Sequence, residues 1–177
     1  MKQRYRSIAS FLLMLYVLPV TAVSEAFSGK DNWVSLGAKN SQFSVSFGAR
    51  SGFFGWEIGG LNGGDYASND IKSYPTSENG YISLGDKNID GPYGLDILHF
   101  ADLSNKFTVY GGVGLYFQDK AEVAQSTTSG LLYTQSSRTS TNAAYSGGLQ
   151  FRAKKTLAFG LGYHTVRGTN AQVMVKF

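Results

Sequence analysis

Apolar residues occupy every second position in several separate segments of this chain, and this alternation restricts the fold more than any other feature. In residues 107–118, Phe, Val and Leu lie on one face, while Thr, Tyr, Gly and Gln lie on the other. A period of two residues is typical of a β-strand with two unlike faces, because an amphipathic helix repeats every 3.6 residues. The sequence therefore predicts eight strands, clearly at 42–50, 54–60, 107–118, 143–152, 157–164 and 171–177, and less clearly at 33–39 and 93–100.

The first 26 residues have the order of a secretory signal peptide. Lys2, Arg4 and Arg6 precede an apolar run at 8–20, and small residues follow it. The run is shorter than the roughly 20 residues that a membrane-spanning helix needs, which favours cleavage over a membrane anchor. Cleavage is expected after Ala26, with a site after Ala22 as the alternative. This predicts a signal peptide at 1–26 and an exported single domain at 27–177.

Charge and cysteine content exclude several classes of function. The whole chain has a formal net charge of +4, of which the first 26 residues contribute +2, so the exported part keeps only +2. Such a balance gives no argument for a nucleic-acid partner. The chain has no cysteine, which removes disulfides, thiol catalysis and cysteine metal sites from consideration.

Residue size on the two faces separates a membrane barrel from a soluble one such as a lipocalin. The less apolar faces carry many glycines and isolated charges, whereas a solvated exterior would carry dense Lys and Glu. A narrow eight-stranded lumen has room for few large side chains. The apolar faces of six strands are free of charge, as contact with lipid requires. The sequence therefore predicts an all-β protein, an eight-stranded antiparallel up-and-down transmembrane β-barrel.

The connections between the predicted strands alternate in length. Short ones fall at 50–52, 101–106 and 153–155, and long polar ones at about 62–91 and 119–141, with modest ones at 39–42 and 165–169. Outer-membrane barrels have short periplasmic turns and longer outer loops. Asn79-Gly80 and Asp90-Gly91 are turn signals, and 81–86 and 130–135 can form extra strand outside the barrel. Four tyrosines in these loops could contact a partner or could simply be solvated: Tyr66, Tyr74, Tyr81 and Tyr133.

The whole pattern resembles the small OmpA-like and OmpX-like outer-membrane barrels. A signal peptide, eight alternating segments and the stretch GLGYHTVRGTNAQVMVKF, which resembles their last hairpin, carry the resemblance. It implies that Val173, Val175 and Phe177 form the assembly signal read by the barrel-assembly machinery. It also implies a location in the outer membrane of a Gram-negative cell. The implied partners are outer-membrane lipid and lipopolysaccharide, with periplasmic chaperones during biogenesis.

Six polar residues on the predicted inward faces form a candidate lumen polar network. Because buried charges in a narrow barrel must pair, we expect a salt-bridged lumen and no wide pore, with a narrow porin as the alternative. No cofactor is expected, and no metal site either, because nothing gathers three or four ligands. The residues of the network are Arg50, Glu57, Asp96, Arg152, His164 and Lys176.

The strongest enzymatic alternative is a lipid-modifying barrel. Outer-membrane lipid A deacylases resemble the chain in size and strand number, and they use a histidine and a serine two residues apart. Here His99 is followed at that spacing by Ala101, and His164 by Val166. The sequence therefore predicts a non-enzymatic barrel that is structural or that interacts through its outer loops, in adhesion to a host partner or in envelope integrity.

Overall fold

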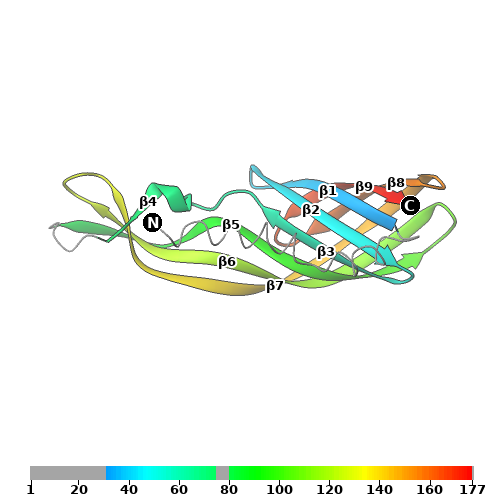
Figure 1. The fold of residues 1–177 in the computed structure, drawn as a ribbon, viewed down its shortest axis with the longest axis horizontal. Coiled ribbons are helices and arrows are strands. Elements are labelled where there is room, and N and C mark those ends of the chain that lie inside the picture. The colour runs from blue at the N-terminus through cyan, green and yellow to red at the C-terminus, as the bar shows by residue number, and fades with distance from the viewer. Residues whose placement is uncertain (1–30, 75–79, 177) are drawn as a thin grey trace, which may run out of the picture.

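The strands of the computed structural model, which describes residues 31–74 and 80–176, close into a barrel (Figure 1). Each barrel strand pairs antiparallel with the next, and the last pairs with the first, which confirms the predicted fold class. Within the described ranges, no helix is long and apolar enough to cross a membrane. The eight barrel strands are β1 (Asp31–Lys39), β2 (Gln42–Ser51), β3 (Phe54–Leu61), β5 (Tyr81–Asp102), β6 (Phe107–Ser126), β7 (Leu132–Lys154), β8 (Leu157–His164) and β9 (Gly168–Lys176).

Side chains of opposite character cover the two faces of the barrel. The outer wall exposes apolar side chains such as Ile97, Val113 and Leu161, whereas buried inward positions include Ser46 and Gln172. This arrangement is the reverse of a soluble barrel, which buries its apolar face and exposes its polar one. The structure therefore confirms the prediction that the apolar face of each strand points outward and the polar face points into the lumen.

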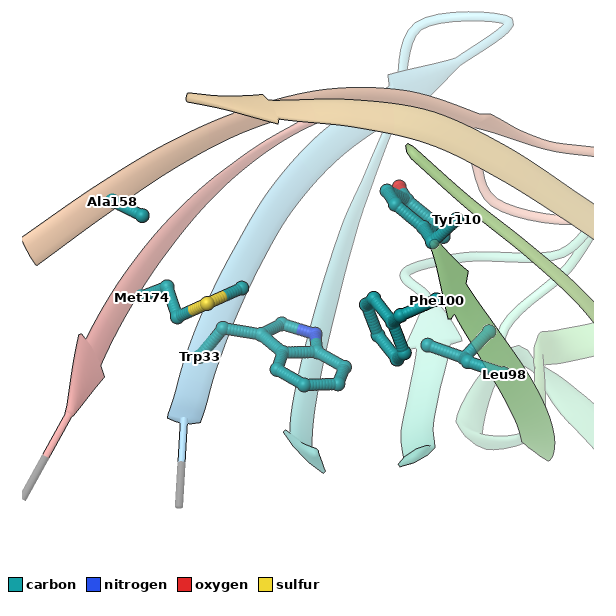
Figure 2. Packing of buried hydrophobic residues seen from close by; sticks show 6 residues of the cluster. All are labelled: Trp33, Leu98, Phe100, Tyr110, Ala158 and Met174. Carbon is teal, nitrogen blue, oxygen red and sulfur yellow. The ribbon is translucent and has the colours of Figure 1, made fainter. Parts of the chain in front are cut away.

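The interior also contains an apolar layer that the sequence did not predict. Figure 2 shows this cluster of buried side chains inside the barrel, in which the ring centroids of Trp33 and Phe100 are 5.7 Å apart. Inward glycines make room for these side chains, because a Cβ atom on Gly48 would lie 2.2 Å from the Trp33 ring. The glycine-rich faces thus hold large rings from other strands. The layer consists of Trp33, Leu98, Phe100, Tyr110, Ala158 and Met174.

The barrel has two unlike ends. The turn end carries the β2–β3, β5–β6 and β7–β8 turns, with the start of β1 and the end of β9. At the opposite loop end, β5, β6 and β7 continue well beyond the barrel, since they have 22, 20 and 23 residues against 8 to 10 in the other barrel strands. We call residues 81–92, 118–126 and 132–142 the extension, which projects to the left in Figure 1.

The prediction of long loops at 62–91 and 119–141 was therefore wrong over much of both ranges, but the extra strand expected at 81–86 is present, and that expected at 130–135 is present from Leu132. Asp90-Gly91 does not reverse the chain, because both residues lie within β5. Asp90 has a φ of 56°, and the β5–β6 register shifts between Ile89 and Tyr93, which marks a β-bulge. The same left-handed backbone preference that suits Asp-Gly to a turn also suits it to a bulge. Asn79 lies outside the described residues.

Residues 62–74, which follow β3, cover one face of the extension. They form a bridge from Tyr66 to Ile89, a 3-10 turn η1 (Ser68–Asp70) and a short strand β4 (Ile71–Ser73) that pairs parallel with β7. Ile71 packs there with Ala121 and Val123 in a second small core. Because this core holds the sheet on one side, the extension is a structured continuation of the barrel.

The predicted assembly signal falls on the strand that closes the barrel. Val173 pairs with Val34 of β1 and Val175 pairs with Asn32, and both valine side chains lie on the outer wall. Phe177 lies outside the described residues.

Candidate functional site

Two adjacent strands and a turn from another part of the barrel wall bring ionisable side chains to one level of the lumen. Glu57 of β3 and Asp96 of β5 are register partners, and both point inward. His164 ends β8, and the turn that follows places the Arg167 side chain inside the barrel. The exposed fraction of all four residues is 2% or less. We call Glu57, Asp96, His164 and Arg167 the lumen charge cluster.

The two carboxylates of the cluster are bound by charge and by hydrogen bonds. The Arg167 guanidinium pairs with Glu57 and lies 3.5 Å from Asp96 Oδ2. Trp33 Nε1 donates to Glu57 Oε2 at 2.9 Å, and the Tyr116 hydroxyl donates to Asp96 Oδ2 at 2.7 Å. Buried charges are tolerated only with such partners, so the cluster ties together the strands that contribute to it.

The hydrogen bonds of His164 fix its tautomer. Its Nδ1 accepts hydrogen bonds from the backbone N–H groups of Val166, at 3.0 Å, and Arg167, at 3.1 Å. Nδ1 therefore carries no proton, and Nε2–H donates to Asp96 Oδ1 at 3.0 Å. Because both ring nitrogens are engaged, neither is free to accept a proton from a substrate. This geometry suits a structural role for the imidazole.

The predicted lumen network is divided between two places. Arg50 and Arg152 lie at the turn end, on the far side of the apolar layer from the lumen charge cluster. Arg50 donates hydrogen bonds of 3.1 and 2.7 Å to the two Asp102 oxygens, and these bonds hold the pKa of Asp102 below its usual range. Arg152 Nη2 lies 3.3 Å from Asp31 Oδ2. The backbone of Lys176 pairs with that of Asp31.

Sequence reasoning missed Arg167, the cation of the lumen charge cluster. The alternation of faces predicts where a strand residue points, but Arg167 belongs to a turn, where no such pattern exists. The aromatic donors Trp33 and Tyr116 were not predicted as partners of the carboxylates either. Tyr116 does lie on the predicted inward face of 107–118, and this inward position is the sequence signal that could have identified it as a partner.

The described residues contain no group of three or more His, Asp or Glu side chains that could hold a metal ion. His99, the other histidine, lies on the outer wall beside two phenylalanine rings. Its ring centroid is 6.5 Å from that of Phe53 and 5.3 Å from that of Phe54. It is therefore remote from the lumen charge cluster.

Comparisons with known proteins return solved structures only. No protein-family model matches the chain, and no curated protein matches it in sequence. Neisserial surface protein A (NspA) is 15% identical with a TM-score of 0.44, over 84% of this chain and 94% of its own. Ail, the attachment invasion locus protein of Yersinia pestis, is 13% identical with a TM-score of 0.44, over 83% and 95%.

The architecture is established by the strand pairing together with the polarity of the two faces. Eight antiparallel strands close through β9 and β1, the outer wall is apolar, and charges pair inside. The chain therefore has the fold of a small eight-stranded outer-membrane β-barrel.

Proposed function

We propose that this chain is a non-enzymatic integral outer-membrane protein with a plugged lumen, which acts structurally or through interactions of its loop end. The distribution of polarity carries the proposal, since apolar side chains cover the outside and charged side chains pair inside. Hydrocarbon tolerates a closed barrel because every backbone group on its wall is paired. The turn end would then face the periplasm and the loop end the cell exterior.

Two filled layers support a plugged lumen over the alternative of a narrow porin. The apolar layer around Trp33 and Phe100 lies toward the turn end, and the lumen charge cluster lies beyond it. Side chains that are almost fully buried leave little space for a continuous water path. Eight-stranded barrels are in general just filled by their side chains.

The two histidines support a protein without lipid-modifying activity. His164 has both ring nitrogens engaged, and His99, which lies on the lipid-facing wall, has alanine two residues later instead of serine. Overexpression is expected to leave the mass spectrum of lipid A unchanged. A new lipid A species that depends on either histidine would favour the enzyme alternative.

The extension supports interaction at the loop end. Tyr74, Tyr81 and Tyr133 pack together there, with ring centroids 4.6 to 6.4 Å apart, instead of standing as separate loop side chains. A paired sheet presents a preformed surface, which lowers the entropic cost of binding. Its proposed partners are lipopolysaccharide saccharides around it and a host or envelope protein.

Cell fractionation and gel mobility test the proposal directly. The protein is expected in the outer-membrane fraction, with a mobility that changes on heating because a folded barrel resists the detergent. Recovery in the soluble periplasmic fraction would refute the membrane location.

Replacing Leu161 with lysine tests which face meets lipid. Leu161 lies mid-strand on the outer wall of β8 and is 69% exposed. In a bilayer, Leu161→Lys should lower the free energy of unfolding by about 2–4 kcal/mol, because the ammonium group enters hydrocarbon. Denaturant titration in phospholipid vesicles measures the loss. Leu131→Lys, in the β6–β7 turn of the extension, is the control and should have little effect; equal stability of the two variants would contradict a lipid-facing wall.

Deleting Phe177 tests the proposed role of this residue in assembly. The deletion should lower the amount of protein in the outer membrane, because the assembly machinery would lack its aromatic signal. Refolding of the purified variant into detergent should remain normal. Quantitative immunoblotting of membrane fractions measures the effect, with Phe177→Tyr as the aromatic control. Normal membrane levels of the deletion variant would reject the assigned signal.

A further inference from the structure

Two neighbouring turns gather four cations at the turn end of the barrel. Strand β6 begins where β7 ends, with Phe107 paired to Phe151. The Arg152 N–H donates to the Lys106 carbonyl at 2.8 Å, which fixes the β5–β6 turn beside the β7–β8 turn. We call Lys106, Arg152, Lys154 and Lys155 the turn-end cationic group.

The carboxylates nearby leave most of this charge without a protein partner. Asp102 is bound by Arg50 and by the Thr108 hydroxyl, which donates at 2.5 Å. Asp31 pairs with Arg152. The ammonium groups of the three lysines make no hydrogen bond or ion pair with any part of the chain that the structure describes. Like charges on neighbouring turns repel one another, so an anion would relieve the repulsion.

A cavity of about 820 Å³ opens between the two turns. The Oγ atom of Ser104 accepts hydrogen bonds from the N–H groups of Lys106 and Phe107, so its own O–H remains available to donate. Cationic and neutral donors around one cavity are the groups that bind a phosphate oxyanion. The lining residues are Asp102, Ser104, Asn105, Thr108, Arg152, Lys155 and Thr156.

The cavity lies on the lumen side of the wall, where Asp102, Thr108 and Arg152 face inward, at the level where the outer apolar face ends. Phe107 and Phe151 form an outer aromatic pair with ring centroids 5.3 Å apart, directly beside Lys106 and Arg152 in sequence. Aromatic rings of membrane barrels collect at the boundary between hydrocarbon and headgroups. The cations thus stand at the level that phospholipid phosphates would occupy.

From these observations we propose that the turn-end cavity is a binding site for a phosphate oxyanion, held by Arg152, Lys155 and the donors of the two turns. The phosphate would come from the headgroup of an anionic phospholipid in the adjacent leaflet or from free phosphate. Lys106 and Lys154 add attraction at the rim. The site lies opposite the loop end and is independent of the role proposed there.

Phosphate binding can be measured on the full folded barrel. In a phosphate-free maltoside detergent, inorganic phosphate is titrated against amide resonances of 102–108 and 152–156, with chloride at equal ionic strength as reference. In nanodiscs, the same resonances are compared between phosphatidylglycerol and phosphatidylcholine. The test variant is Lys106→Gln/Lys154→Gln/Lys155→Gln. The matched control, Lys72→Gln/Lys87→Gln/Lys120→Gln, removes three lysines from the loop end.

The turn-end variant should bind at least about tenfold more weakly, the loss expected when charge-assisted hydrogen bonds are removed. The control variant should bind like the unmodified protein. Saturable chemical-shift changes with inorganic phosphate would support the site and would show that the free anion is sufficient as a ligand. Shifts only with phosphatidylglycerol support the site with the lipid headgroup as ligand. No specific shift in either arm, or equal weakening in both variants, would overturn the proposal.

Discussion

Replacing Arg167 with methionine will lower the free energy of unfolding by about 3–5 kcal/mol, the range for removing one partner of a buried ion pair. Arg167 faces both Glu57 and Asp96, and all three are 2% exposed or less. Without the guanidinium, two carboxylates stay in a closed interior with no cation between them. Urea titration in phospholipid vesicles, followed by fluorescence and gel mobility, measures the loss.

Arg138→Met is the matched control for this prediction. Arg138 also pairs with an aspartate, Asp86, but its side chain is 66% exposed on the extension. Exposed ion pairs contribute about 0–1 kcal/mol, so this variant should remain near the original stability. Adding Glu57→Gln to Arg167→Met should recover part of the loss, because one uncompensated charge is removed. If both arginine variants lost the same free energy, the lumen charge cluster would not be the ion-pair core inferred here.

Replacing Trp33 with alanine should cost about 3–5 kcal/mol, as large aromatic truncations in packed interiors do. Trp33 is 3% exposed, packs edge-on against Phe100 and covers Gly48. The truncation leaves a cavity in the apolar layer and takes away the Nε1–H donor of Glu57. The same titration, followed by gel mobility since one tryptophan is lost, measures this change.

Trp33→Phe separates the two parts of that loss. It keeps most of the apolar volume but removes the hydrogen bond to Glu57, which should cost about 1–3 kcal/mol. Phe47→Ala on the outer wall is the control, because lipid chains can fill the space that its ring leaves. A Trp33→Ala variant no less stable than Phe47→Ala would show that the interior is not tightly packed.

The sequence was sufficient to predict the barrel and the direction in which most of its strand residues point. Strict alternation in residues 107–118 and 157–164 placed Tyr116 and His164 inside and Leu161 outside, as the structure has them. This works because side chains of a strand alternate between two faces, and only one of the two faces can meet lipid. Weak alternation at 33–39 and 93–100 concealed the inward rings of Trp33 and Phe100.

Local turn signals were less reliable at the loop end. Asp90-Gly91 predicted a chain reversal, but β5 passes through it as a bulge because β6 continues to offer a pairing partner on the other side. Whether a residue with left-handed backbone geometry forms a turn or a β-bulge depends on that pairing partner, which lies far along the chain. The extension and the second core around Ile71 and Val123 follow from the same long-range pairing.

The sequence by itself determined the strand number, the closed antiparallel barrel and the apolar outer wall. The period of two residues marks the strands, residue size and charge on the two faces show which face meets lipid, and a sheet in lipid must close to pair its edges. Only the tertiary structure decided which charges meet. Glu57, Asp96 and His164 are far apart in the chain, and barrel closure brings them around Arg167, a turn residue without any periodic signal. The pairing of buried charges is a property of distances across the lumen, and a linear pattern does not contain those distances.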